Sequence, residues 1–404
     1  MKRSFQLAAF AAAIAAASAF AQQPPLKMGA INPFSGPMAQ YGAEVTRGFE
    51  MAADKVNASG GLLGRRVQIL NGDASNPQQA IQAVELLMNR DKVDFFAGSY
   101  TSGISNTASD AAMRFDRVYL ETIALSEDLT MRGLPNYLRT GPNAETFAIS
   151  TIDTLRDLVA PTVKKPFRDL KVWIEHEDSS YGTSIGQKQK RLLEAFGVKV
   201  VGIGSHSGRA VDLNDTVLRM KYAAPDVLLE TGYVADGNLL LKTMRDQGFK
   251  PMATVFIGTG DTPETLQSLG AAGVEGLLVI TYPRSDVSEK FAPGVKGFLD
   301  AYRAKYKSDP IQTQSLTSFV GTQILFEAIQ AAGSTEPSKV LAAAAKMDKP
   351  IGTYLNGFGV KFDKNFQNLR AMTTTVQWQD GKVVTVFPKT AVNPGVELKP
   401  MARQ

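Results

Sequence analysis

The chain has 404 residues, no cysteine, and 44 basic against 39 acidic residues, a net charge of +5. Without cysteine it can form neither a disulfide nor the lipid-modified cysteine of a lipoprotein anchor. Its basic residues are interspersed with acidic ones along the whole chain rather than gathered in one stripe, so nucleic acid is not expected as a partner.

The first 21 residues predict an export signal that is removed from the mature protein. Lys2 and Arg3 precede an apolar run, and Ala19 and Ala21 supply small residues at the −3 and −1 positions, so we expect cleavage after Ala21. A membrane anchor is the weaker alternative because the apolar run is shorter than the roughly 20 residues that span a bilayer. The remaining chain exceeds the ~250 to 300 residues at which one core usually stops growing, so two domains are expected.

A β-α-β unit occupies Met28 to Leu70, with a Pro/Gly loop at Pro33–Pro37 and a glycine turn at Gly60-Gly61. Further apolar runs then alternate with helical patterns: Val93–Ala97, Val118–Leu120, Leu170–Ile174, Val198–Ile203, Val227–Leu229, Val255–Ile257 and Leu277–Ile280. This alternation predicts an α/β protein whose parallel sheets carry helices on both faces.

Two motifs in the first unit are specific: SGPMAQYG at 35–42, and NASGGLLGR at 57–65. With the closing WQDGKVVTVFP segment, they resemble the branched-chain amino acid (LIV-type) solute-binding proteins of ABC transporters. The resemblance implies the type I periplasmic-binding-protein fold: two doubly wound parallel-sheet lobes joined by a hinge that the chain crosses three times. Crossings are expected near Thr140–Asn143, near Thr281–Pro283, and within Gly352–Asp363.

The resemblance also implies a division of the chain and a function. Residues 1–21 form the signal peptide, 22–141 plus 282–352 the N-terminal lobe, and 142–281 plus 353–404 the C-terminal lobe. The protein is expected to be a periplasmic receptor that captures a small carboxylate and delivers it to an ABC permease in the inner membrane. A monomer without cofactor is the family habit. A ligand sensor module for a signalling partner is the alternative from another class.

The segment Gly98–Gly103 follows an expected strand and opens a helix, a place where open α/β sheets bind ligands. It contains Tyr100, Thr101 and Ser102. From spacing alone, serine and threonine before a helix are more often caps than ligand contacts. The resemblance instead implies that Ser102 and the neighbouring backbone amides hold the carboxylate of the ligand.

Two departures from the resemblance concern the ammonium group of an amino acid ligand. Leu125, next to Ala124, stands where amino acid receptors place a threonine, and Gly260 stands where they place a glutamate. Burying an ammonium without an acceptor costs several kcal/mol. The sequence therefore favours an aromatic or other non-amino acid carboxylate, as in the aromatic-acid branch of the family. If Asp261 replaces the glutamate, the protein is a leucine, isoleucine or valine receptor instead.

Aromatic residues complete the expected site. Tyr41, Tyr181 and Tyr233 match family positions that line the cleft, and Tyr282 is a weaker candidate at the hinge. A tyrosine offers an apolar face and a polar tip, which suit a ring or branched chain that ends in a carboxylate.

Catalysis is not expected. The chain lacks a cysteine nucleophile, and its only histidines, His176 and His206, have no metal-binding spacing, so neither an enzyme nor a metal site is predicted.

Overall fold

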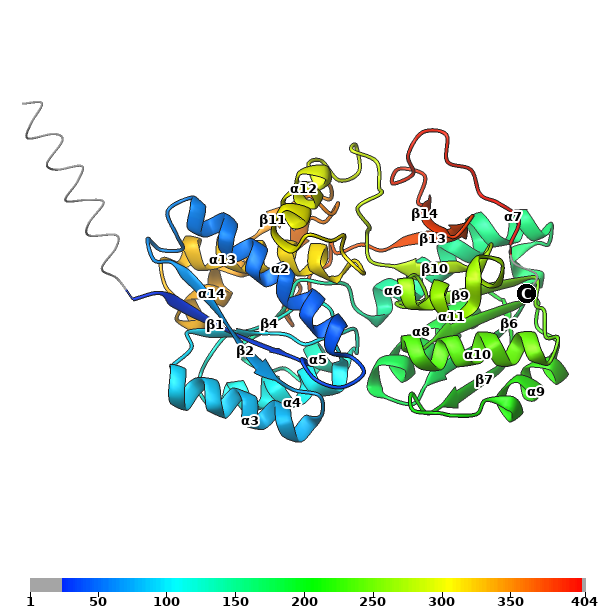
Figure 1. Cartoon of the computed structure of the whole chain (residues 1–404), viewed down its shortest axis with the longest axis horizontal. Coiled ribbons are helices and arrows are strands. Elements are labelled where there is room, and N and C mark those ends of the chain that lie inside the picture. Colours follow the sequence, from blue (N-terminus) through cyan, green and yellow to red (C-terminus); the bar gives the residue numbers. More distant parts are fainter. Residues whose placement is uncertain (1–23, 402–404) are drawn as a thin grey trace, which may run out of the picture.

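Two separate β-sheets, each covered by helices on both faces, organise the chain and lie side by side (Figure 1). This computed structural model describes residues 24–401, so the expected signal peptide and its cleavage site lie outside the described part. The α/β class with parallel sheets is confirmed. Within residues 24–401, no helix is both long enough and apolar enough to cross a membrane.

The first sheet has five parallel strands in the order β2-β1-β3-β4-β5. They are β1 (Leu26–Asn32), β2 (Val67–Asp73), β3 (Phe95–Ala97), β4 (Tyr119–Glu121) and β5 (Tyr137–Arg139). One face packs on α2 (Ala39–Ala58) and α13 (Gln314–Ala332). The other face packs on α3 (Pro77–Leu86) and α4 (Ser102–Met113).

The second sheet has seven strands in the order β14-β13-β10-β9-β8-β6-β7. The parallel strands are β6 (Lys171–Glu177), β7 (Lys199–His206), β8 (Val227–Thr231), β9 (Ala253–Ile257) and β10 (Leu278–Thr281). The antiparallel hairpin β13 (Thr374–Gln379) and β14 (Lys382–Phe387) completes one edge. One face carries α6 (Ala144–Thr154) and α8 (Ser180–Ala195), and the other carries α9 (Asn214–Ala223), α10 (Val234–Asp246) and α11 (Pro263–Val274).

The remaining elements are short or peripheral: α5 (Asp128–Met131), α7 (Ala160–Val163), α12 (Val295–Tyr306), α14 (Pro337–Ala344), β11 (Asp348–Lys349) and β12 (Val360–Lys361), with single turns of π-helix at Leu87–Asp91 and Leu155–Val159 and of 3-10 helix at Phe167–Asp169.

The chain passes between the two sheets after β5, after β10 and before β13. The segment after β12 still contacts the first sheet, because the backbone N–H of Arg139 donates to the carbonyl of Phe366 (3.0 Å). The side-chain amide of Asn368 likewise donates to the carbonyl of Thr140 (3.0 Å). We therefore propose lobes of residues 24–141 plus 282–372 and 142–281 plus 373–401, with the third crossing later than the expected 352–363.

Candidate ligand-binding site

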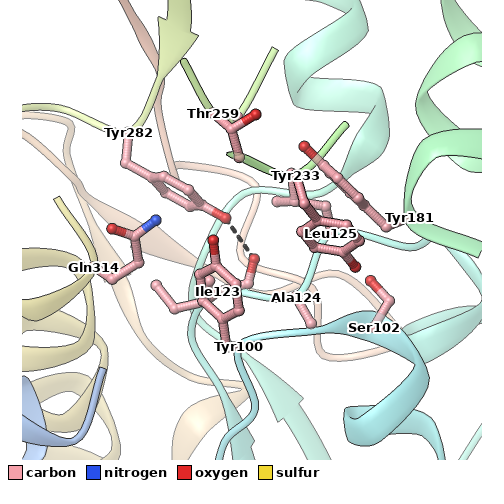
Figure 2. A pocket seen from close by; sticks show the side chains of 11 residues that line it. Tyr100, Ser102, Ile123, Ala124, Leu125, Tyr181, Tyr233, Thr259, Tyr282 and Gln314 are labelled. Carbon is pink, nitrogen blue, oxygen red and sulfur yellow. Dashed lines mark hydrogen bonds between the residues drawn. The ribbon is translucent and has the colours of Figure 1, made fainter. Parts of the chain in front are cut away.

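The carboxyl ends of strands from both sheets face one another, and side chains from the loops that follow them converge there (Figure 2). They enclose a cavity of about 30 Å³, room for about one or two water molecules. Residues of both lobes line it: Tyr100, Ser102, Ile123, Ala124, Leu125, Tyr181, Tyr233, Gly258, Thr259, Tyr282 and Gln314. An organic ligand would fit only if the lobes separate or the rings rotate.

A wider cavity of about 810 Å³ lies outside the small one and shares Tyr100 and Tyr233 with it. Its other lining residues include Tyr41, Thr101 and Glu264. Its volume is in the range of small-molecule sites. Because the same two rings line both spaces, they form the partition between the inner cavity and the wider cleft.

Ser102 is the first residue of α4 and is buried at the inner cavity. Its hydroxyl oxygen accepts the backbone N–H of Ser126 (3.1 Å), so its hydrogen can be donated to a ligand. The preceding Thr101 is the N-cap, and its hydroxyl accepts the N–H of Ile104 (3.4 Å). Thr101 therefore caps the helix, whereas its neighbour Ser102 lies at the cavity.

Glu121 lies fully buried beneath the two loops of the first lobe that line the cavity. One carboxylate oxygen accepts the N–H of Ser99 (2.8 Å), and the Ser105 hydroxyl donates to the same oxygen. The other oxygen accepts three successive N–H groups, from Thr122 (2.8 Å), Ile123 (2.8 Å) and Ala124 (2.9 Å). Burial raises the pKa of Glu121 to about 7, although these donors act in the opposite direction. A single side chain thus joins both loops.

Four tyrosines form a continuous row across the cleft. The rings of Tyr41 and Tyr100 stack with centroids 5.4 Å apart, Tyr100 and Tyr233 are 6.4 Å apart, and Tyr233 and Tyr181 are 5.3 Å apart. Burial raises the pKa of the hydroxyls of Tyr100, Tyr181 and Tyr233, so these groups stay neutral. The row offers apolar ring faces to a ligand body.

Leu125 and Ala124 line the inner cavity, whereas Asp261 lines neither cavity. The Asp261 side chain is 2 % exposed, and its carboxylate pairs with Arg284 (3.1 Å). Gly260 has φ +100°, and a Cβ there would lie 2.6 Å from the Phe256 ring, so an acidic residue at 260 would be strained and crowded. The inner cavity consequently has no carboxylate in its lining.

Several lining residues were not expected from the sequence. Gln314 begins α13, is 1 % exposed, and its side-chain oxygen has no hydrogen-bond partner among the described residues. Ile123, Gly258 and Thr259 line the cavity as well. Tyr282, a weak candidate from its sequence, also lines it and donates to the carbonyl of Ile123 (Figure 2). No local signal marked Gln314, because α13 follows the site loops by a long stretch of chain.

Contacts between the lobes close the cleft around this site. Glu264, from α11, accepts hydrogen bonds from the side chains of Gln40 and Tyr41 at the start of α2. The hydroxyls of Ser126 and Ser184 are 3.2 Å apart, and the N–H of Glu127 donates to Ser184 (3.3 Å). The structure is therefore a closed form.

Comparisons with known proteins give a consistent result. A family model described as "Periplasmic binding protein" matches residues 25–382. The chain is 35% identical over 396 residues, 98% of each protein, to the Leu/Ile/Val-binding protein homolog 7 of Brucella melitensis.

Two solved structures have the same fold at low identity. One is a branched-chain amino acid transporter substrate binding protein from Streptococcus pneumoniae in complex with isoleucine, with a TM-score of 0.75, 22% identity, and coverage of 90% of this chain and 100% of that one. The other is an ABC transporter solute binding protein from R. palustris in complex with benzoate, with a TM-score of 0.74, 17% identity, and coverage of 92% and 100%.

Proposed function

Since this chain belongs to the periplasmic binding protein family of ABC transport systems, we propose that it captures a small aromatic or other non-amino acid carboxylate and delivers it to an ABC permease. Members of this family bind solutes and are not enzymes. We also propose that the chain is exported and cleaved after Ala21, and that it acts as a monomer.

The observation that carries the ligand class is the lack of a carboxylate in the lining of the inner cavity. Leu125 replaces a hydroxyl residue with an apolar side chain, Gly260 has none, and Asp261 is engaged by Arg284. An ammonium buried in the inner cavity would meet no carboxylate in its lining and would cost several kcal/mol. A ligand that carries only a carboxylate avoids this cost.

The proposed pose places the ligand carboxylate at Ser102, near the start of α4, where helical N–H groups favour an anion. The apolar body then lies against the rings of Tyr100, Tyr181 and Tyr233. The free side-chain oxygen of Gln314 offers an acceptor for a hydroxyl on the ligand. This combination of apolar walls and a few polar groups is usual for small-molecule sites.

Binding would act as a population shift between open and closed forms. The proposed contacts come from Ser102 on one side and Tyr181 and Tyr233 on the other, so the ligand touches both only when the lobes close over it, with the rings rotated to make room in the inner cavity. The contacts of Glu264 and Ser184 across the cleft would then form together with the ligand contacts.

A leucine, isoleucine or valine receptor is the second candidate, favoured by the name of the 35%-identical Brucella melitensis relative. The two solved structures do not decide between the candidates, because one holds isoleucine and the other benzoate.

The test is a thermal-shift screen of refolded mature protein with benzoate, hydroxybenzoates, phenylpropanoid acids and leucine, because a ligand that binds only the native state raises its melting temperature. A shift with an aromatic acid and none with leucine supports the proposal. A shift with leucine alone would overturn the ligand class.

A further inference from the structure

Four polar side chains are buried together inside the second lobe, and none of them lines the inner cavity. They are Glu175 on β6, His206 at the end of β7, Glu230 on β8 and Asp236 in the first turn of α10. The parallel register places Glu175 beside Gly204 on one neighbour and beside Glu230 on the other. Glu175 and Glu230 are 0 % exposed, Asp236 1 % and His206 7 %.

The distances in this cluster suit a metal ion bound through the Nε2 atom of His206. That atom lies 3.2 Å from Asp236 Oδ2 and 3.8 Å from Glu230 Oε1, and one donor atom from each of the three residues lies within 4.8 Å of the others. Donor atoms bound at about 2.0 to 2.2 Å in a tetrahedral site are separated by about 3.3 Å. Small side-chain movements would bring the three donors to a common ion.

Glu230 is the observation that points beyond a buried acidic cluster. Both of its carboxylate oxygens are buried, and neither has a hydrogen-bond partner among residues 24–401. The other two carboxylates are oriented by protein donors: Glu175 accepts the indole N–H of Trp173 (3.0 Å), and Asp236 accepts the backbone N–H of Tyr233 (3.1 Å). A fully buried carboxylate without a donor is costly unless a cation meets it.

We propose that His206, Glu230 and Asp236 bind one divalent transition-metal ion, with Zn²⁺ as the reference ion. The Nδ1 atom of His206 lies 3.1 Å from Glu175 Oε1, so an N–H there donates to this carboxylate, and a metal at Nε2 would replace the proton that Nε2 shares with Asp236 Oδ2 (3.2 Å). Histidine ligands of metals are usually held by such a carboxylate. The Glu230 and Asp236 carboxylates balance the charge of the dication.

The donor set indicates the class of ion. One imidazole nitrogen with carboxylate oxygens suits Zn²⁺ or Mn²⁺, whereas Ca²⁺ and Mg²⁺ prefer sites made of oxygen ligands alone. Gly232 borders the cluster, and a Cβ there would lie 2.4 Å from Asp236 Oδ2 and 2.7 Å from Glu230 Oε1. The glycine therefore keeps the space beside these two oxygens free of a side chain.

The position of the cluster suggests a structural role in ligand binding. Glu230 is the residue before the last in β8, which leads through Gly232 to Tyr233, and Asp236 accepts the backbone N–H of Tyr233. A metal that joins Glu230 to Asp236 would fix the loop whose tyrosine lines both cavities. Its function is therefore to hold one wall of the cleft in place.

No short spacing in the sequence predicted this site, because each of its residues lies on a different strand or helix. The histidine spacing predicted no metal, whereas the parallel register of β6, β7 and β8 brings the donors together.

The test uses the mature protein without an affinity tag, stripped with a chelator, incubated with ZnCl₂ or MnCl₂ and then desalted. Metal content by mass spectrometry should be one equivalent per chain, and the melting temperature should rise with the metal. Glu230→Gln and His206→Gln should weaken Zn²⁺ binding by about tenfold or more. His176→Gln is the matched control, since this buried histidine bonds to the Glu177 carbonyl and lies outside the cluster.

Unmodified protein that retains no metal and shows no thermal shift would overturn the proposal, as would equal Zn²⁺ affinity in His206→Gln and His176→Gln. The first of these results does not depend on whether a variant folds. Neither result depends on which carboxylate ligand binds in the cleft.

Discussion

The carboxylate of Glu121 accepts the backbone N–H of Ser99 at a distance of 2.8 Å. Its other oxygen accepts the N–H of Ala124 (2.9 Å), so one buried side chain joins the loop before Ser102 to the loop that contains Leu125. The geometry of the proposed ligand site therefore depends on a residue that does not line it.

Glu121 should make stability depend on pH. Its pKa is raised from an ordinary value of 4.5 to about 7 by burial, so the native state favours the protonated form. The stabilisation is complete below pH 4.5 and is lost as the pH rises through about 7, in total about 3 kcal/mol. Urea unfolding of the unmodified protein and of Glu121→Gln between these pH values measures it. The variant should lack this component, and parallel pH profiles would contradict the assignment.

Ser102→Ala should weaken binding of an aromatic carboxylate by about 1 to 3 kcal/mol, because it removes a buried hydroxyl donor. Thr101→Ala is the matched control, since it removes the helix cap and should cost about 1 kcal/mol of stability instead. Calorimetric titration gives the affinity of each variant, and urea unfolding gives its stability. If Thr101→Ala weakened binding more than Ser102→Ala, the two roles would be reversed.

Local pattern predicts much of this fold. The apolar runs at Val93–Ala97, Leu170–Ile174 and Val255–Ile257 overlap β3, β6 and β9, because buried parallel strands are continuously apolar. The strand β5, only Tyr137–Arg139, was missed. Its Arg139 is fully buried, which local pattern does not suggest, and its side chain donates to the carbonyl of Ser126 (2.8 Å) and to Gln367, far along the chain.

The site shows the same division between local and distant information. Ser102 and Leu125 line the cavity from segments that directly follow strands, where sequence patterns are informative. Gln314 reaches the cavity only because α13 packs on α2. The side chain of Asp261 turns to Arg284, a residue 23 positions later, so its place outside the cavity depends on tertiary structure.

Asp261→Asn should leave binding of an aromatic carboxylate unchanged while it lowers the free energy of unfolding, because the Arg284 side chain, 24% exposed, loses its buried partner. Titration with benzoate and urea unfolding measure the two effects. Under the leucine-receptor alternative the same variant would abolish leucine binding. A large loss of affinity for any ligand without a loss of stability would place Asp261 in the site.

Tyr41→Phe should weaken ligand binding several-fold without affecting the ring faces. The substitution keeps the stack on Tyr100 but removes the hydroxyl that donates to Glu264 on the other lobe. The substitution removes a contact that only the closed form makes, so closure becomes less favourable. The net free energy of ligand binding therefore becomes smaller.

Small-angle scattering with saturating ligand reports the closed fraction, which should fall in this variant. Tyr306→Phe is the control, because its hydroxyl donates to Glu50 (2.6 Å), and both residues belong to the proposed N-terminal lobe. That variant should leave affinity and scattering unchanged. Equal effects of the two substitutions would mean that the Tyr41 contact stabilises the protein without controlling closure.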